Sequence, residues 1–184
     1  MDRSEPITPR RWHHRPNHLF ELGRTYMVTA STLHSQRLFD TPARLSFLEA
    51  ALLSETKTHG WNVEAWAVFP NHYHVVASSP QDGRTLRNWV RAVHSQTARE
   101  LNAMDGMPGR QVWFQFWDNC ISFVASYYAR LNYVLNNPVK HGYAERAEEY
   151  PYGCARWFGQ NADAVFVKRV RSYGWERVRV YDPF

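Results

Sequence analysis

The sequence has little cysteine, no long apolar run and no internal repeat, and each absence excludes a class of protein. Two cysteines, Cys120 and Cys154, in 184 residues are too few for a disulfide framework and lack the spacing of a zinc site. No apolar stretch approaches the roughly 20 residues needed to cross a bilayer. Residues 1–6 also lack the apolar stretch of a secretory signal. We therefore expect a cytosolic protein with no membrane partner.

Aromatic and basic residues are what the sequence does contain. Hydrophobic residues make up 44% of the chain and aromatic residues 15%, which is enough for the core of one ordinary domain. Lys and Arg outnumber Asp and Glu by 22 to 17, so the net charge is +5. Positive charge gathers at both ends of the chain, at Arg3, Arg10, Arg11 and Arg15 and at Lys168, Arg169, Arg171, Arg177 and Arg179. A clustered basic surface favours binding to phosphate groups.

The first half of the chain predicts a strand, a helix and a strand hairpin. Residues 25–33 are rich in β-branched and aromatic side chains, as strands are. Thr41 suits an N-cap, Pro42 the first position of a helix, and Gly60 its end. The apolar stripe of this helix is Leu45, Leu48 and Leu52.

Two further strands, residues 61–69 and 72–78, are separated by two turn residues, which favours an antiparallel hairpin. In this register Phe69 lies opposite His72 and Ala67 opposite His74. Ala65 would lie on the same face, and the two small alanines would leave room for a metal and a substrate.

The second half predicts a helix over 84–102, a strand over 112–121, and a helix over 123–136 that Pro138 ends. The apolar face of the first of these helices is Leu86, Trp89, Val90, Val93, Thr97 and Leu101. Its opposite face carries Arg84, Arg87, Arg91 and His94. This basic stripe is equally well explained as a solvated surface.

The order of elements predicts an α+β fold of the ferredoxin-like type. A βαββαβ series forms an antiparallel sheet with helices on one face, and here an added C-terminal helix and a tail follow it. We divide the chain into an irregular basic arm (1–22), a catalytic domain (23–144) and a C-terminal extension (145–184). The extension is a candidate for DNA contact.

His72-Tyr73-His74 is the first candidate for chemistry. Side chains alternate faces along a strand, so both imidazoles point the same way and can hold one cation. Tyr73 then points away from the cation, into the hydrophobic layer beneath the helices. Alone, two histidines on one strand face are more often surface or packing residues than ligands.

Tyr133 is the second candidate. Residues four apart share a helix face, so Tyr133 and Asn137 can address the same point. A phenol is a poor nucleophile at neutral pH, and a nearby divalent cation that activates the electrophile remedies this. The carbonyl of Asn137 could add an oxygen ligand, although a tyrosine on a helix is usually structural.

Taken together, these motifs resemble the REP-associated tyrosine transposases, relatives of insertion-sequence transposases with a His-hydrophobe-His motif and one catalytic tyrosine. The resemblance covers roughly residues 24–144. It is carried by Thr25-Tyr26-Met27-Val28-Thr29 with Arg37-Leu38-Phe39, by Ala67-Val68-Phe69-Pro70-Asn71-His72-Tyr73-His74-Val75-Val76, by Phe116-Trp117-Asp118 through Ile121, and by Tyr133 through Asn136-Asn137-Pro138-Val139-Lys140-His141-Gly142. The middle residue of the His motif, Tyr73, departs from the aliphatic residue of the family pattern.

The resemblance implies a mechanism for each matched residue. His72 and His74, with Asn137 as a third ligand, would bind Mg²⁺ or Mn²⁺ and polarise a phosphodiester. Tyr133 would attack it and form a 5′-phosphotyrosine link, which a free 3′-hydroxyl can later reverse.

The resemblance also implies the substrate, single-stranded DNA beside palindromic hairpins, handled by a monomer or a homodimer in the bacterial cytoplasm at the nucleoid. Candidate DNA contacts are Arg84, Arg87, Arg91, Lys140, Lys168, Arg169 and Arg171, because such DNA offers phosphates to basic side chains and bases to aromatic rings. For Lys140 and its neighbour His141, a polar turn is an equally good reading.

Two other functions stay open on the sequence alone. The first is a domesticated protein that binds hairpin DNA and has no role in transposition. The second is a small metal hydrolase unrelated to DNA, for which DNA binding at low salt would be absent.

Overall fold

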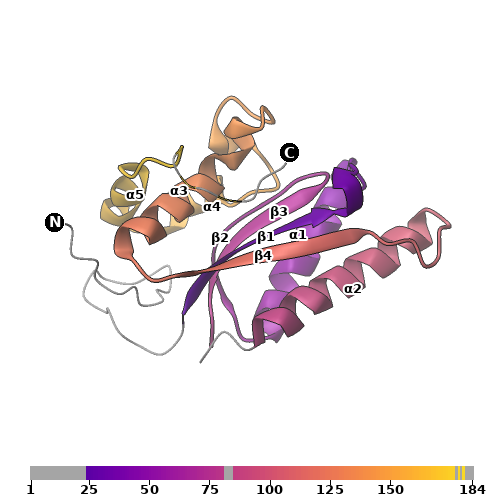
Figure 1. Ribbon diagram of the computed structural model, residues 1–184. Coiled ribbons are helices and arrows are strands. Elements are labelled where there is room, and N and C mark those ends of the chain that lie inside the picture. The colour runs from indigo at the N-terminus through magenta and orange to yellow at the C-terminus, as the bar shows by residue number, and fades with distance from the viewer. Residues whose placement is uncertain (1–23, 81–84, 177, 179, 181–184) are drawn as a thin grey trace.

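The computed structural model describes residues 24–80, 85–176, 178 and 180. Its elements in chain order are β1 (Thr25–Thr32), η1 (Leu33–Ser35), α1 (Pro42–Thr58), β2 (Asn62–Val68), β3 (His72–Ser78), α2 (Leu86–Met104), β4 (Trp113–Ile121), α3 (Val124–Lys140), η3 (Ala147–Glu149), α4 (Ala155–Asn161) and α5 (Ala164–Arg171). The strands form one antiparallel sheet in the order β2-β3-β1-β4 (Figure 1). The predicted ferredoxin-like α+β fold is confirmed.

Helices cover both faces of this sheet (Figure 1). α1 and α2 lie on one face, over a core that includes Leu48, Val75 and Trp89. The added helix α3 lies on the other face with α4 and α5, over a second core that includes Val76 and Leu131. Among the residues described, no helix is both long and apolar enough to span a membrane. Each face of the sheet therefore has its own hydrophobic core.

The signals at the ends of α1 act as expected. The side chain of Thr41 accepts a hydrogen bond from the backbone N–H of Arg44, and Pro42 opens the helix. Gly60 follows the last turn with a φ of 71°, a left-handed conformation that glycine adopts without steric cost. The predicted stripe of Leu45, Leu48 and Leu52 is buried.

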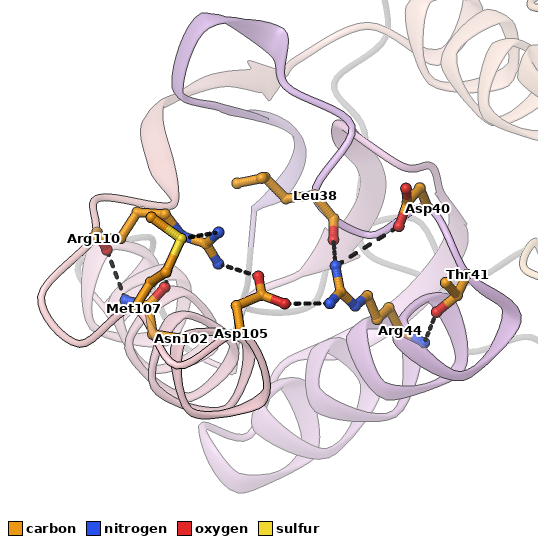
Figure 2. Close-up of polar contacts among 8 residues, drawn as sticks. All are labelled: Leu38, Asp40, Thr41, Arg44, Asn102, Asp105, Met107 and Arg110. Carbon is orange, nitrogen blue, oxygen red and sulfur yellow. Dashed lines mark hydrogen bonds and ion pairs between the residues drawn. The ribbon is translucent and has the colours of Figure 1, made fainter.

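A network of charged side chains joins the start of α1 to the end of α2 (Figure 2). Asp105 accepts hydrogen bonds from Arg44 and Arg110, the latter over 2.7 Å. Arg44 also donates to the carbonyl of Leu38 over 3.0 Å. The hydrogen bond from Arg110, together with the charge of Arg44, lowers the pKa of the Asp105 carboxyl. The network holds the two helices of this face in register.

The end of α3 differs from the prediction. We expected Pro138 to end this helix at 136, but the helix runs through it to Lys140. Proline removes one N–H, which costs a single hydrogen bond, and the backbone N–H groups of His141 and Gly142 still bond to Asn137 and Val139. Asn137 therefore keeps its place on the helix face of Tyr133.

The hairpin register is as predicted. Ala67 pairs with His74, and Ala65 pairs with Val76 on the same face. Tyr73 points to the opposite face, where it is fully buried against Trp113. Burial raises its pKa far above the usual value, so it stays a neutral phenol and lies in the core as expected.

The C-terminal residues pack onto the α3 face, which the sequence did not reveal. Residues 152–154 run beside the free edge of β2, where Cys154 N–H donates to the carbonyl of Trp66 and Val68 N–H to that of Tyr152. Phe158 of α4 and Val170 of α5 are buried in the second core. The division of the chain at residue 144 remains a prediction.

Candidate metal and tyrosine site

His72 and His74 point from β3 toward α3 with their ring centres 5.1 Å apart. They are 1% and 0% exposed. The small side chains of Ala65 and Ala67 lie on the same face of the neighbouring strand β2. Strand alternation thus brings the two rings together as the sequence predicted.

His141 completes a cluster that sequence reasoning missed. Nitrogen atoms of His72, His74 and His141 lie within 4.8 Å of one another, close enough to bind one metal ion. His141 follows the last residue of α3, and its ring centre is 5.1 Å from that of His72. A signal was present, since His141 is four residues after Asn137 and eight after Tyr133. It was lost because Pro138 was expected to end the helix.

Hydrogen bonds at the outer nitrogens orient the strand histidines. Asn71 Oδ1 lies 2.8 Å from His72 Nδ1, and the amide nitrogen of Asn71 donates to the carbonyl of Ser35. The amide oxygen therefore faces His72, so Nδ1 carries the proton and Nε2 keeps its lone pair. On the neighbouring strand, Thr29 Oγ1 lies 2.8 Å from His74 Nδ1. Partners of this kind orient metal-binding imidazoles.

Tyr133 lies on α3 beside the histidines. Its ring is 5.4 Å from that of His74, and its side chain is buried. The Lys140 ammonium donates a hydrogen bond to the phenol oxygen over 3.0 Å and lies 4.9 Å from the ring centre. Lys140 was predicted to contact DNA, and here it touches the candidate nucleophile. A cation at this oxygen stabilises negative charge that develops there.

Asn137 lies one helical turn after Tyr133 and one turn before His141. It is fully buried, and neither polar atom of its side chain has a hydrogen-bond partner among the described residues. A buried amide without partners is costly. It is therefore a group suited to a ligand that enters the site.

The predicted DNA-contacting residues are divided between the two faces. Arg87 and Arg91 are exposed on α2, across the sheet from the histidines, so the structure does not bring them to the site. Arg84 lies outside the described residues. On the α3 side, Lys168 and Arg169 are exposed on α5, whereas Arg171 forms an ion pair with Glu148 at 2.6 Å.

His94 does not extend the basic stripe as the sequence suggested. Its ring stacks on Trp113 with ring centres 4.3 Å apart, and Tyr73 OH lies 3.1 Å from its Nε2. Burial lowers the pKa of His94 from its usual 6.5 to about 3. It is therefore a neutral, half-buried histidine. The prediction was wrong because helical spacing alone does not say which residue at the edge of a face turns inward.

Fold and site together define a ferredoxin-like α+β protein that carries a histidine cluster and a tyrosine on the helix above it. No protein-family model matches the chain. A REP-associated tyrosine transposase of Escherichia coli (strain K12) is 22% identical over 131 residues, which cover 71% of this chain and 75% of that protein. A Haemophilus influenzae relative with the same family name is 27% identical over 97 residues, 48% of this chain and 55% of that protein.

A solved structure of a REP-associated tyrosine transposase bound to a REP hairpin matches the fold. The TM-score is 0.60 at 19% identity, over 78% of this chain and 84% of that chain. The resemblance to the REP-associated tyrosine transposases that the motif blocks indicated is thus confirmed, and the shared fold extends over most of both chains.

Proposed function

We propose that this chain cleaves and rejoins single-stranded DNA beside hairpins through a phosphotyrosine intermediate at Tyr133. The observation that carries the proposal is the convergence of His72, His74 and His141 with Tyr133 in one buried site. The named relatives, which are transposases, support a transposase-like role in DNA processing.

The donor set fits a divalent metal ion. Three imidazoles, two of them oriented by Asn71 and Thr29, offer nitrogen ligands, and the amide oxygen of Asn137 is available one turn away. Of Mg²⁺ and Mn²⁺, nitrogen donors favour the transition metal, and we propose Mn²⁺ as the better fit. Such an ion supplies Lewis acidity that polarises a phosphodiester oxygen.

Tyr133 and Lys140 then have different roles in the reaction. The Tyr133 phenol releases its proton to solvent water, its phenolate oxygen attacks phosphorus and forms the new oxygen–phosphorus bond, and the bond to the 3′-oxygen breaks. The departing 3′-oxygen takes up a proton and becomes a hydroxyl, while the 5′-phosphate stays on Tyr133. Attack by another 3′-hydroxyl reverses these bonds and joins strands. Lys140 holds the phenol oxygen and stabilises its negative charge before attack.

DNA hairpins are the substrate we propose, because the solved structural neighbour is bound to a REP hairpin. Lys168 and Arg169 of α5 lie on the α3 side of the sheet, where they can meet phosphates of DNA that enters the site. We place this activity in the bacterial cytoplasm, at the nucleoid.

A covalent-adduct assay tests the proposal. Purified protein with Mn²⁺ and hairpin-bearing single-stranded DNA from its own genome should yield a protein–DNA adduct that denaturing gels resolve. Tyr133→Phe should abolish the adduct and retain hairpin binding, and Tyr128→Phe on the same helix is the matched control. An adduct that persists in Tyr133→Phe would exclude Tyr133 as nucleophile. Hairpin binding without any wild-type adduct would instead favour a DNA-binding protein without cleavage.

A further inference from the structure

A pocket of about 320 Å³ adjoins the candidate site on the α3 face. Met27 and Thr29 of β1 form its floor and Arg130 of α3 one wall, and its other lining residues are Phe116, Trp117, Asp118 and Asn119 of β4 and Val180 near the C-terminus. Thr29 pairs with both His74 and Trp117, and residues directly opposite in a sheet share a face. The pocket and the histidine cluster therefore share a floor residue.

The pocket is also continuous with the site along α3. Arg130 precedes Tyr133 by three residues, so their side chains leave neighbouring positions of the helix surface. α3 packs mainly on β2 and β3, whereas β4 is an edge strand. α3 thus does not cover the β1–β4 side of this face, where Trp117 is partly buried and Val180 also lines the pocket.

Arg130 gives the pocket a positive charge. Burial lowers the pKa of its guanidinium, yet an arginine stays protonated in proteins. It donates to Ser126 Oγ, and no carboxylate lies within ion-pair distance of it among the described residues. A partly buried cation without an acidic partner favours an anion.

Asp118 also lines the pocket, but its position on β4 directs its carboxylate away from Arg130. Asp118 pairs with Val28, whose side chain lies in the core beneath α1 and α2. Alternation therefore directs the Asp118 carboxylate to the opposite face from Trp117. The polar groups directed to the pocket face are the guanidinium, the Asn119 amide and the Thr29 hydroxyl.

We propose that this pocket binds the unpaired nucleotide next to the cleaved phosphodiester, with its phosphate on Arg130 and its base against the Trp117 ring. This inference rests on the function proposed above. A guanidinium matches phosphate geometry, and an aromatic ring on a single-strand path supplies a stacking surface for a base. The volume lies at the lower end of the roughly 300–1,000 Å³ of ligand pockets, which suits a single nucleotide.

The test combines protein variants with modified DNA. Arg130→Gln and Trp117→Leu are compared with Arg99→Gln, on the exposed side of α2, and with Trp157→Leu of α4. Hairpin oligonucleotides carry one abasic site or one uncharged methylphosphonate at each unpaired position. Adduct yield in Mn²⁺ and affinity by fluorescence anisotropy are both measured, with thermal unfolding as a check of folding. Arg130→Lys serves as a second variant that keeps the charge.

We expect losses of roughly ten- to a hundredfold for Arg130→Gln and Trp117→Leu, and none for the controls. Arg130→Lys should recover part of the loss. At the nucleotide next to the cut, the abasic site should add no further loss to Trp117→Leu, and the methylphosphonate none to Arg130→Gln, because each pair removes the same contact.

Two results would overturn the pocket assignment: losses from the protein and DNA changes that add at every position, or equal adduct yields and affinities for all variants. In either case, adduct formation by the wild type would still support the cleavage activity. If the wild type forms no adduct, the proposed cleavage activity is wrong, and the pocket is tested by the anisotropy measurements alone. Non-additive losses of affinity at the nucleotide next to the cut would then support a nucleotide site. Equal affinities of all variants would overturn it.

Discussion

Along β3 the two faces of the sheet are equally buried, but they differ in chemistry. Along β3 every residue from His72 to Ser78 is buried, yet alternate residues lie under different helices. Tyr73, Val75 and Ala77 face α1 and α2 and belong to an apolar core. His72 and His74 face α3, beside Tyr133 and the partnerless amide of Asn137.

This difference shows that burial alone does not separate stability from function. Buried polar groups are costly unless something satisfies them. On the α1–α2 face, the Tyr73 hydroxyl and His94 Nε2 lie within hydrogen-bond distance of each other. The α3 face gathers ligating and nucleophilic groups around one point, as a site for metal and substrate requires. Substitutions on the two faces should therefore have separable effects.

The largest expected effect on chemistry comes from His74→Ala on the α3 face. Loss of a ligand removes several kcal/mol of transition-state stabilisation, so adduct formation should fall at least about a thousandfold. Unfolding free energy should change far less, by about 1–2 kcal/mol, because one hydrogen bond to Thr29 is lost. Adduct kinetics and urea unfolding measure the two. Chelation of the metal should reproduce the kinetic loss in the wild type, and a chelator without effect would contradict the metal requirement.

The converse variant, Trp89→Ala, removes a core side chain from the α1–α2 face. Trp89 is fully buried and stacks on Trp61 at 5.0 Å, so its loss should cost about 3–5 kcal/mol of unfolding free energy. Adduct formation per folded molecule should be unchanged. Urea unfolding with Trp157→Ala, a partly exposed tryptophan, as the control checks this. Loss of adduct formation in Trp89→Ala protein that is still folded would show that the two faces are not separable.

A finer comparison within the α3 face identifies the third ligand. His141→Ala should weaken Mn²⁺ binding by at least about tenfold, since it removes an imidazole from the cluster. Asn137→Ala should weaken it less, because an amide oxygen is the poorer ligand for this metal. Isothermal titration with Mn²⁺ measures both, and the reverse order would return the role to Asn137.

The last comparison concerns pH and the α1–α2 face. His94 has a folded pKa of about 3 and a usual value of 6.5, so below pH 6.5 the unfolded chain takes up a proton that the folded chain does not. Its contribution to stability is therefore present above pH 6.5 and is lost as the pH falls toward 3, by up to about 1.4 kcal/mol per pH unit. His94→Gln should flatten the pH dependence of urea unfolding in this window, measured without metal. An unchanged slope would show that His94 is already protonated in the folded state.

Local signals predicted much of the fold and part of the site. Period-two alternation determined the register that places Ala67 opposite His74 and the direction of Tyr73. The capping residues of α1 act as expected. These predictions succeeded because each depends on backbone geometry within a few residues.

The errors arose where distant contacts outweigh a local preference. Packing of α3 on the sheet carries the helix through Pro138, and the spacing of His94 on α2 did not reveal its stack on Trp113. The first error concealed the place of His141 in the histidine cluster, and the second concealed a neutral, half-buried histidine.

By itself, the sequence determined that His72 and His74 share a strand face, because a strand alternates with a fixed period. Only the tertiary structure decided what meets them. The docking of α3 on the sheet brings Tyr133, Asn137 and His141 to the histidines, and the free side of β4 leaves the pocket of Trp117 and Arg130 beside them. Contacts between residues far apart in the chain depend on how whole elements pack, and no local period encodes that packing.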